Sequence, residues 1–575
     1  MRKRAPARSY GEDPKRLNGT PDPMADSPEQ GQPRAVEADA DPAIAPAPRR
    51  GSRAVRSIAS IASLVALLVI VSKSLGFLRE VIIAGAFGRG IDRDAYGLAY
   101  QLPSLALVLL GGQNGPFHTA TLAALTRMRA AGRKDRANAI VTLVLTSGGV
   151  MAVLGALVFV FAPAIVRIQG PWAPAQTHAL AAALLRIMVP ILVIGAWVGV
   201  LSGISNDRGE YGLPAISPAM TSLAIIAFVA WRHGDPLMLA IGTTVGAVAQ
   251  IALQGLPALW ASRTPWLKVR PMSWREPVIK EASSLLWPAI LSSSIGTINA
   301  FIGTFFLSKA GNGAISSWAY ANVIYQLPLG TLLSSLLVPL FPRLTAAAAR
   351  EDYPALRALL DRGVAVVSLV AIPLAAGLSV LAIPIVRLAF DRGAFARTHA
   401  TAPTALVLAI LCLGLVAYAL RDVLVRVFYA INDARTPLRV SLISISLNVV
   451  LNAIFMFVFK LGLAGIALSA ALVTWANFLQ IAWALQQRLK EHDPVHAASA
   501  GPILWSGRAD LLKVLIAAGV AGALGRWLVL LHWPHGKLFV LAEILVVSVG
   551  GLLAYGGVLL GLGLRPDGIL KRARA

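Results

Sequence analysis

Long apolar segments separated by short polar connections occupy most of this 575-residue chain. Roughly fourteen of these segments reach the length of about 20 residues that a helix needs to cross a bilayer. They lie near residues 57–88, 94–115, 138–163, 178–204, 211–232, 236–260, 283–308, 314–341, 362–390, 403–431, 437–459, 461–487, 510–531 and 537–563. The pattern predicts an all-α polytopic membrane protein with about fourteen transmembrane helices.

The composition supports this class. Hydrophobic residues make up 56% of the chain and charged residues only 14%, whereas about a quarter of the residues in soluble domains are charged. Residues 1–53 are rich in Pro, Ala, Asp and Arg without a hydrophobic period, which predicts a disordered cytoplasmic tail. The single cysteine, Cys412, excludes an intramolecular disulfide and a cysteine-based metal site, and we predict no catalytic residue, metal or cofactor.

The net charge of +24 comes from basic residues that gather in alternate connections between the apolar segments. No nucleic-acid-binding motif accompanies them, so we expect no nucleic-acid partner. Basic residues concentrate in cytoplasmic loops, and this rule predicts that both termini are cytoplasmic. The basic connections carry Arg127, Arg129, Arg133, Lys134 and Arg136, then Arg263, Lys268, Arg270, Arg275 and Lys280, then Arg343, Arg350 and Arg357, and finally Lys571, Arg572 and Arg574 in the tail 564–575.

Two short motifs recur at nearly one offset. Tyr100-Gln101-Leu102-Pro103 returns 225 residues later as Tyr325-Gln326-Leu327-Pro328, and Asn206-Asp207 returns 226 residues later as Asn432-Asp433. The recurrence predicts an internal duplication, with one six-helix lobe at 54–260 and a second at 283–487, joined by a cytoplasmic linker at 261–282. Because each lobe has an even number of crossings, the two should be parallel. Such repeats are typical of transporters that bind substrate between their lobes.

Three ionisable side chains interrupt the first apolar segment. Lys73, Arg79 and Glu80 lie within residues 58–88, where each charge costs on the order of 3 kcal/mol at membrane depth. On a helix, Lys73 and Glu80 are two turns apart on one face. Such clusters usually mark a transport pathway or a polar cavity, although Glu80 could simply neutralise Arg79.

Three motifs occur in order: SKSLGFLREVIIAGAFG at 72–88 followed by Asp94-Ala95-Tyr96, FDRGAF at 390–395, and RVFYAINDARTP at 426–437. Together they resemble the MurJ (MviN) lipid II flippase family of the MOP exporter superfamily. The GGQNGPFH turn at 111–118 and the RDVLVRVFYA stretch at 421–430 resemble its cyanobacterial-type subgroup in particular. The resemblance implies a MATE-like fold in which residues 510–563, after the cytoplasmic loop 488–509, add two helices that could form a groove for a lipid tail.

The resemblance implies a non-enzymatic flippase in the bacterial cytoplasmic membrane. Its substrate would be lipid II, an undecaprenyl-pyrophosphate-linked peptidoglycan precursor, and its partners would be membrane lipids and the peptidoglycan synthesis machinery. By position in the motif, Lys73 and Arg79 correspond to cations of the headgroup pathway, Glu80 to the neighbouring acid, and Asp94 to the acid that opens the second span.

The chain also departs from the family pattern. Leu107 and Val108 stand near the basic pair that the family usually carries in the second span, and Asn322 with Val323 replaces an Asp-Arg pair in the eighth. Arg421 or Arg426 in the tenth span could supply the missing charge, although the i,i+4 spacing of Asp422 and Arg426 also fits a local salt bridge. Weaker substrate-binding predictions are Asn114 at a Gly-rich turn, Asn299 in the seventh span, and Asn322 itself.

Three other functions stay open. One is export of another polyprenyl-linked oligosaccharide or a MATE-like antiport. Another is a membrane-embedded glycosyltransferase, which is disfavoured because its chemistry needs acidic residues in a large outer loop. The third is a scaffold of cell-wall synthesis that transports nothing. No Walker motif supports ATP hydrolysis, and no sodium site can be identified from the sequence, so the energy source is open.

Overall fold

The computed structural model describes residues 51–564 except 113–114, 134, 261–270, most of 274–297, 331–339, 493–507, 532 and 535. Most of the predicted N-terminal tail and the predicted residue Asn114 therefore lie outside the described residues. Residues from Ile58 onward form one compact unit.

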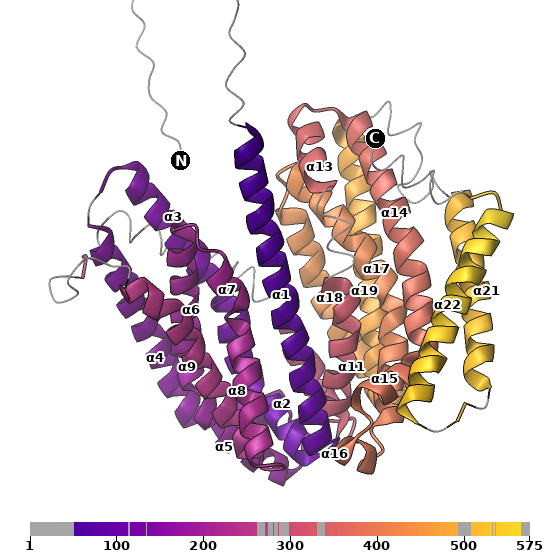
Figure 1. Ribbon diagram of the computed structural model, residues 1–575, viewed down its shortest axis with the longest axis horizontal. Helices are drawn as coiled ribbons and strands as arrows, with labels where there is room; N and C mark the ends of the chain where they lie inside the picture. The colour runs from indigo at the N-terminus through magenta and orange to yellow at the C-terminus, as the bar shows by residue number, and fades with distance from the viewer. Residues whose placement is uncertain are drawn as a thin grey trace, which may run out of the picture. The chain divides into compact units, whose positions relative to one another are not determined.

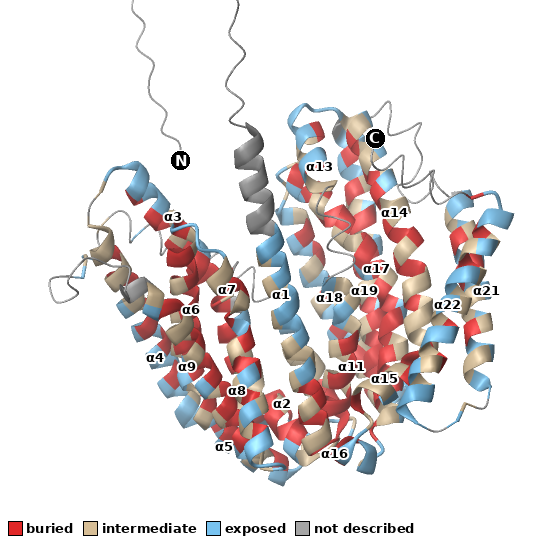
Figure 2. Cartoon of the chain, viewed as in Figure 1, coloured by how far each residue is buried: buried red, intermediate tan, exposed pale blue. Residues whose placement is uncertain are grey.

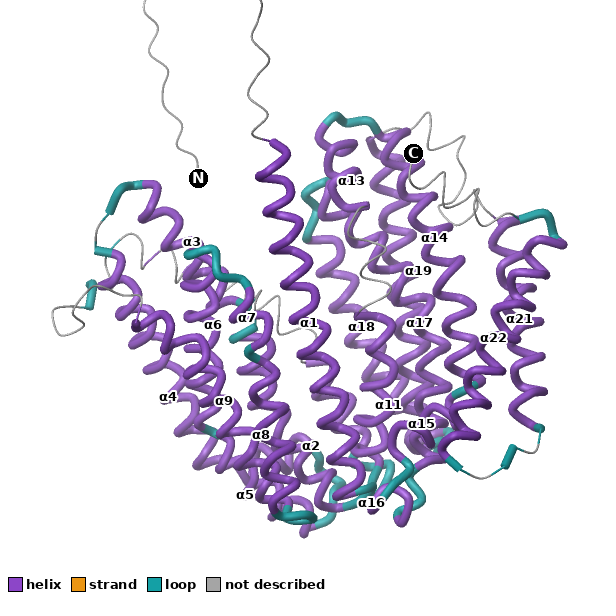
Figure 3. The backbone as a smooth tube through the Cα atoms, in the orientation of Figure 1, coloured by secondary structure: helices purple, strands orange, loops and turns teal. Residues whose placement is uncertain are grey.

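The first half of the described chain consists of helices (Figures 1 and 3). They are α1 (Gly51–Phe87), α2 (Ile91–Ser104), the π-helical segment η1 (Leu105–Leu110), α3 (Pro116–Ala130), α4 (Arg136–Gln169), α5 (Ala175–Met188), α6 (Pro190–Asp207), α7 (Gly212–Ile216), α8 (Pro218–Trp231) and α9 (Pro236–Trp260).

The second half begins, among the described residues, with the short apolar helix Ile298–Leu307. It continues with α11 (Ala314–Pro328), α13 (Leu340–Ala349), α14 (Tyr353–Val380), α15 (Ala382–Phe390), α16 (Gly393–Arg397), α17 (Thr401–Ala430), α18 (Arg435–Ala453), η4 (Ile454–Val458), α19 (Gly462–His492), α21 (Arg508–Leu530) and α22 (Lys537–Gly561).

Helix is the only secondary structure that satisfies the backbone polar groups of a separate apolar segment inside a bilayer. Ten helices of the described residues are long and apolar enough to cross one. Each of the fourteen predicted segments is at least partly helical where the structure describes it. The all-α membrane fold is confirmed, whereas the count of fourteen crossings stays a prediction.

The helices differ in how far other helices cover them (Figure 2). In an 18-residue window, 72% of α6 and 61% of α17 is buried, against 22% of α4, 22% of α21 and 17% of α22. Helix α6 contacts α3, α4, α9 and η1, and α17 contacts α11, α14, α15 and α19. Thus α6 and α17 are the central helices of the two lobes, while the exposed leucines, valines and phenylalanines of α4 form a lipid-facing surface.

Both repeated motifs have matching local structure in the two lobes. Each Tyr-Gln-Leu-Pro sequence ends an α-helix that continues as π-helix, at η1 after Pro103 and at residues 329–330 after Pro328. The proline at the end of each motif cannot donate a backbone hydrogen bond, which favours such a local change of winding. These paired features agree with the predicted duplication.

The two Asn-Asp motifs also have equivalent roles. Asp207, at the end of the central helix α6, pairs with Arg129 and Arg136. Asp433, just after the central helix α17, accepts hydrogen bonds from Thr436 and pairs with Arg488. Burial opposes ionisation of Asp433, but these hydrogen bonds and the Arg488 charge hold its pKa below the usual range. Each aspartate therefore fastens the end of its central helix to neighbouring segments.

The FDRGAF motif packs the second lobe against the connection between α1 and α2. Phe390 and Phe395 are fully buried, with ring centroids 5.3 and 5.4 Å from that of Tyr320. The Tyr320 hydroxyl donates a 2.8 Å hydrogen bond to the Gly88 carbonyl. The motif therefore joins α11 of the second lobe to the turn between α1 and α2 in the first lobe.

Two glycines allow this close approach. Gly88 and Gly393 have φ angles of 61° and 53°, which disfavour side chains. A Cβ at Gly88 would lie 2.5 Å from the Ala394 carbonyl oxygen, and one at Gly393 would lie 2.3 Å from the Gly85 carbonyl oxygen. Backbone from one lobe thus occupies the space that a side chain of the other would need.

Most predicted boundaries lie within a few residues of the observed ones. Helix α1 begins at Gly51 rather than Ser57, and α19 extends to His492, beyond the predicted end of the second lobe at residue 487. Polar residues at these ends continue the helical hydrogen bonding beyond the apolar segment, so hydropathy underestimates the helix length.

We predict that Gly88→Ala lowers the stability of the protein by roughly 2–3 kcal/mol, because alanine meets both a left-handed backbone and a carbonyl oxygen. Thermal unfolding of the purified protein measures the effect. Gly90→Ala is the matched control, since Gly90 has an extended backbone and no atom within 4 Å of an added Cβ. Equal melting temperatures for the two variants would show that the interlocked turns are not needed for stability.

Candidate functional site

The predicted cluster lies on a continuous helix. Lys73, Arg79 and Glu80 are all in α1, which remains α-helical through Gly76. Leu75, Phe77 and Leu78 stand among them, so the charges interrupt an apolar sequence rather than a polar connection. The local sequence therefore forms one helix that carries charge along a limited part of its surface.

Glu80 lies between two guanidinium groups. One Glu80 oxygen, Oε1, accepts from Nη2 of Arg79 at 2.7 Å and from its Nε at 3.2 Å, while Oε2 accepts from Nη2 of Arg93 at 3.0 Å. The Glu80 side chain is only 7% exposed. Because both oxygens are occupied by cations, the carboxylate is satisfied although it is buried.

Arg93 is the member of this ion-pair cluster that sequence reasoning missed. It lies in the first turn of α2, its side chain is 5% exposed, and its guanidinium carbon is 5.5 Å from the centre of the Tyr96 ring and 5.3 Å from that of Tyr320. Aromatic faces stabilise a cation electrostatically where water is excluded. Arg93 therefore holds Glu80 from one lobe while it contacts a tyrosine of the other.

A signal for Arg93 was present in the sequence. Residues 88–90 form a short connection between α1 and α2, so the last turns of α1 lie beside the first turn of α2. A long basic side chain just after such a turn can reach an acid in the last turns of the preceding helix. The cation–π contacts with Tyr320 could not be found in this way, because that tyrosine is more than 220 residues distant in the chain.

Asp94 is next to Arg93 but has a different role. Its carboxylate oxygens accept hydrogen bonds from the backbone amides of Gly313 at 2.6 Å and Ser316 at 2.8 Å. These amides belong to the N-terminal turn of α11, where a carboxylate satisfies otherwise unpaired donors and interacts favourably with the helix dipole. Asp94 is buried, and in this conformation it joins the two lobes rather than facing a ligand.

Lys73 and Arg79 are the accessible cations of the cluster. Lys73 is exposed, and its Nζ donates a 3.2 Å hydrogen bond to the Gly330 carbonyl in the π-helical turn after α11. The Arg79 side chain is 20% exposed. An exposed ammonium group within a spanning helix requires water or a polar ligand beside it. These two side chains can therefore reach an anion, whereas Arg93 is covered.

The predicted cations of the tenth span lie on α17 and differ in their partners. Arg426 forms the expected salt bridge to Asp422, with Nη2 3.2 Å from the carboxylate. Arg421 instead donates from Nε to Asn477 Oδ1 at 2.7 Å, and Asn477 donates to Ser444 at 2.7 Å. The charge of Arg426 is thus compensated locally, while the hydrogen-bond partner of Arg421 is neutral.

The remaining predicted residues are separate from the Glu80 cluster. Asn299 is exposed at the start of helix Ile298–Leu307, and Asn322 is half-buried in α11. Leu107 and Val108, which occupy the places of the expected basic pair, are buried and 71% exposed respectively. Among the described residues there is no group of three or more His, Cys, Asp or Glu side chains that could hold a metal ion.

The sequence is similar to those of known proteins over most of its length. The model of the family described as "Lipid II flippase MurJ" matches residues 83–546. A "Probable lipid II flippase MurJ" from Synechocystis is 35% identical over 476 residues, which cover 80% of this chain and 85% of that protein. A "Lipid II flippase MurJ" from Burkholderia cenocepacia is 30% identical over 432 residues, which cover 73% of this chain and 82% of that protein.

Solved structures agree in fold. "Lipid II flippase MurJ, inward closed conformation" superposes with a TM-score of 0.71 at 21% identity, covering 87% of this chain and 99% of that one. An inward-facing multidrug resistance MATE family transporter of the MOP superfamily gives a TM-score of 0.59 at 15% identity. The superposition covers 74% of this chain and 96% of that one. The two-lobed fold is shared with both, and the match over most of the sequence shows that this chain belongs to the MurJ lipid II flippase family.

Proposed function

We propose that this chain moves lipid II from the inner to the outer leaflet of the bacterial cytoplasmic membrane by alternating access of its two lobes. The observation that carries the proposal is the pair of accessible cations Lys73 and Arg79 on the largely apolar helix α1, in a chain of the MurJ family. Rescue of cells depleted of their lipid II flippase tests it. Failure of a correctly inserted protein to restore growth would contradict it.

The chemistry of the cluster suits the pyrophosphate of such a lipid. Arginine offers planar, paired donors for phosphate oxygens, and lysine offers a compact charge. Because Arg93 holds Oε2 of Glu80, that acid stays in place when a pyrophosphate competes for Arg79. We assign substrate binding to Lys73 and Arg79, positioning to Glu80 and Arg93, and closure between the lobes to Asp94.

An apolar groove offers a place for the polyprenyl tail. A cavity of about 450 Å³ lies between α14, α15, α21 and α22. Its lining is almost entirely aliphatic and small, with Gly377, Gly522, Gly525 and Gly551 among the residues that leave room. The tail would gain burial of apolar surface there while the headgroup moves between the lobes. This agrees with the groove expected from the last two helices.

The direction of transport depends on the orientation of the chain. The basic connections favour an orientation with both termini in the cytoplasm. Direct contact with the peptidoglycan synthesis machinery remains a prediction. The absence of the expected cations at positions 107, 108 and 323 favours one second candidate, a related polyprenyl-pyrophosphate lipid with a different headgroup. Transport assays with both lipids would separate the two.

Removal of the accessible cations should stop transport. We expect the Lys73→Ala, Arg79→Ala double variant to flip lipid II at least tenfold more slowly, because the pyrophosphate loses both exposed charges. A flipping assay in reconstituted vesicles measures the rate. Arg167→Ala, Arg232→Ala is the control, since it removes two exposed cations outside the cluster. Normal flipping by the first variant would refute the assignment.

The two arginines of α17 should respond differently. Arg421→Gln is expected to reduce flipping strongly, because a cation with a neutral partner is available to attract the substrate. Arg426→Gln should have a smaller effect, since Asp422 already compensates its charge. The double variant should abolish transport. Each rate is compared at equal amounts of folded protein, and an unchanged rate in the double variant would exclude α17 from the pathway.

A further inference from the structure

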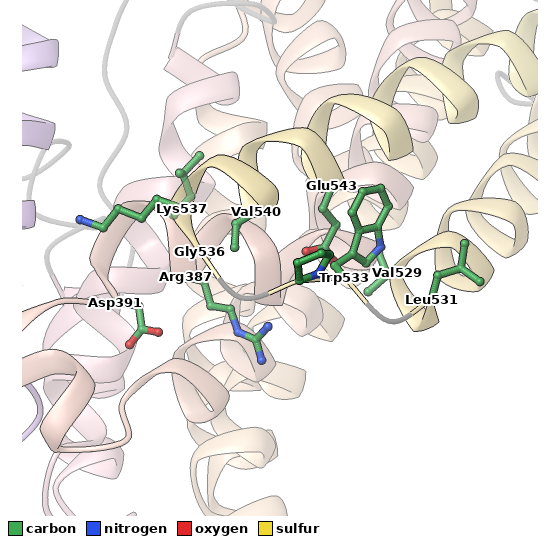
Figure 4. A pocket seen from close by; sticks show the side chains of 11 residues that line it. Arg387, Asp391, Val529, Leu531, Trp533, Gly536, Lys537, Val540 and Glu543 are labelled. Atoms are coloured by element: carbon green, nitrogen blue, oxygen red, sulfur yellow. The ribbon is translucent and has the colours of Figure 1, made fainter.

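We propose that a polar pocket beside the lipid-tail groove is a second headgroup site, which holds the pyrophosphate and first sugar of lipid II after translocation; this rests on the proposed function. The pocket encloses about 460 Å³. Figure 4 shows its polar and aromatic lining, which comes from α15 and the turn after it, from the connection between α21 and α22, and from α22. The residues that matter are Arg387, Asp391, Trp533, Lys537, Val540 and Glu543.

The first observation is a buried acid with no direct partner. Glu543 is only 5% exposed, yet it makes no ion pair or hydrogen bond within the part of the chain that the structure describes. Arg387 lines the same pocket. The carboxylate oxygens of Glu543 are not fully covered by protein, and Glu543 lines the pocket. A ligand with hydroxyl or amide donors would satisfy it.

The second observation is a pair of available cations. Arg387 and Lys537 are both exposed side chains of the pocket, and neither has an ion-pair partner among the described residues. They come from different helices, α15 and α22, which contact each other. A pyrophosphate carries charge on several oxygens and can accept from both cations at once.

The third observation is a fixed aromatic ring. Trp533 donates from its indole nitrogen to the Leu528 carbonyl at 2.9 Å, which anchors the ring at the edge of the pocket. A tryptophan face offers apolar area to the C–H groups of a sugar, while nearby carboxylates such as Asp391 and Glu543 accept from its hydroxyl groups. Cations alone would fit any phosphate, but this mixture of aromatic, acidic and basic groups fits a sugar pyrophosphate.

Continuity with the apolar groove identifies the occupant as a lipid. On α15, Ile385 lines the groove and Arg387 lines the pocket. On α22, Ile544 lines the groove and the adjacent Glu543 lines the pocket. One lipid molecule can therefore place its isoprenoid tail in the groove and its polar head in the pocket. With cytoplasmic termini, the connection between α21 and α22 lies on the outer side, where the headgroup arrives.

Photocrosslinking of the full-length protein tests the site. A photoreactive amino acid is placed at Val540, which lines the pocket, or at Leu538, which is 77% exposed on the same helix and is the control position. The protein is reconstituted in phosphatidylethanolamine–phosphatidylglycerol vesicles with its outer face outward, and radiolabelled lipid II is added from outside. We expect labelling at position 540 to exceed that at 538 by about fivefold or more.

Charge removal then tests the chemistry. Arg387→Gln, Lys537→Gln should lower labelling at position 540 about fivefold, whereas Arg397→Gln, Arg526→Gln, which changes two exposed arginines outside the pocket, should leave it unchanged. Undecaprenyl phosphate, which has the tail without the sugars, should label position 540 less than lipid II does. Equal labelling at 538 and 540, no response to charge removal, or equal labelling by the two lipids would overturn the proposal.

The same vesicles separate this proposal from the function on which it rests. If the wild-type protein flips lipid II but position 540 is not labelled, the pocket is not a headgroup site and the flippase function stands. If wild-type protein does not flip lipid II, the proposed function fails whatever the labelling shows. The Lys73→Ala, Arg79→Ala variant should lose flipping and still be labelled from outside, because the lipid reaches the pocket without crossing.

Discussion

The double salt bridge of Glu80 to Arg79 and Arg93 is the interaction on which the rest of the site depends. A protein that binds a pyrophosphate within the membrane must keep cations there in the absence of substrate, and each uncompensated charge is costly. Glu80 lowers that cost without removing the charge, because one carboxylate serves two guanidinium groups. Arg93 is buried beneath two tyrosines, so the carboxylate cannot follow Arg79 when an anion approaches. The result is one cation that is accessible and a second that keeps the compensating acid in place.

The same few residues connect charge to conformation. Arg93 contacts Tyr320, Asp94 caps the helix that contains Tyr320, and the Tyr320 hydroxyl binds the turn before Arg93. Any motion that separates the lobes at this point must break these contacts together, and it must expose Arg93 to a new environment. Binding at Arg79 and closure between the lobes are therefore coupled through Glu80 and Arg93. Coupling of this kind lets a ligand shift a two-state equilibrium only as far as its affinity differs between the states.

Sequence reasoning predicted the membrane class, the two lobes and the α1 cluster, because hydropathy, an internal repeat and charges in an apolar segment are local signals. It missed Arg93, whose importance depends on a pairing across a turn and on Tyr320 in the other lobe. It also identified FDRGAF only by resemblance, whereas the structure gives its physical basis: Phe390 and Phe395 hold Tyr320, and Gly393 admits the backbone of Gly85. Contacts between lobes are set by tertiary packing, which a one-dimensional pattern does not contain. The roles of Asn114, Arg421 and Arg426 stay predictions.

The departures from the family pattern acquire a physical interpretation through Arg93. The family usually carries an Asp-Arg pair in the eighth span, where this chain has Asn322 and Val323 in α11. Here an arginine from α2 reaches Tyr320, which lies on the same helix two residues before Asn322. A cation thus contacts α11 from the opposite lobe instead of being carried by it. Arg93 therefore places a positive charge beside α11 in a chain whose α11 has Val323 where the family usually carries an arginine.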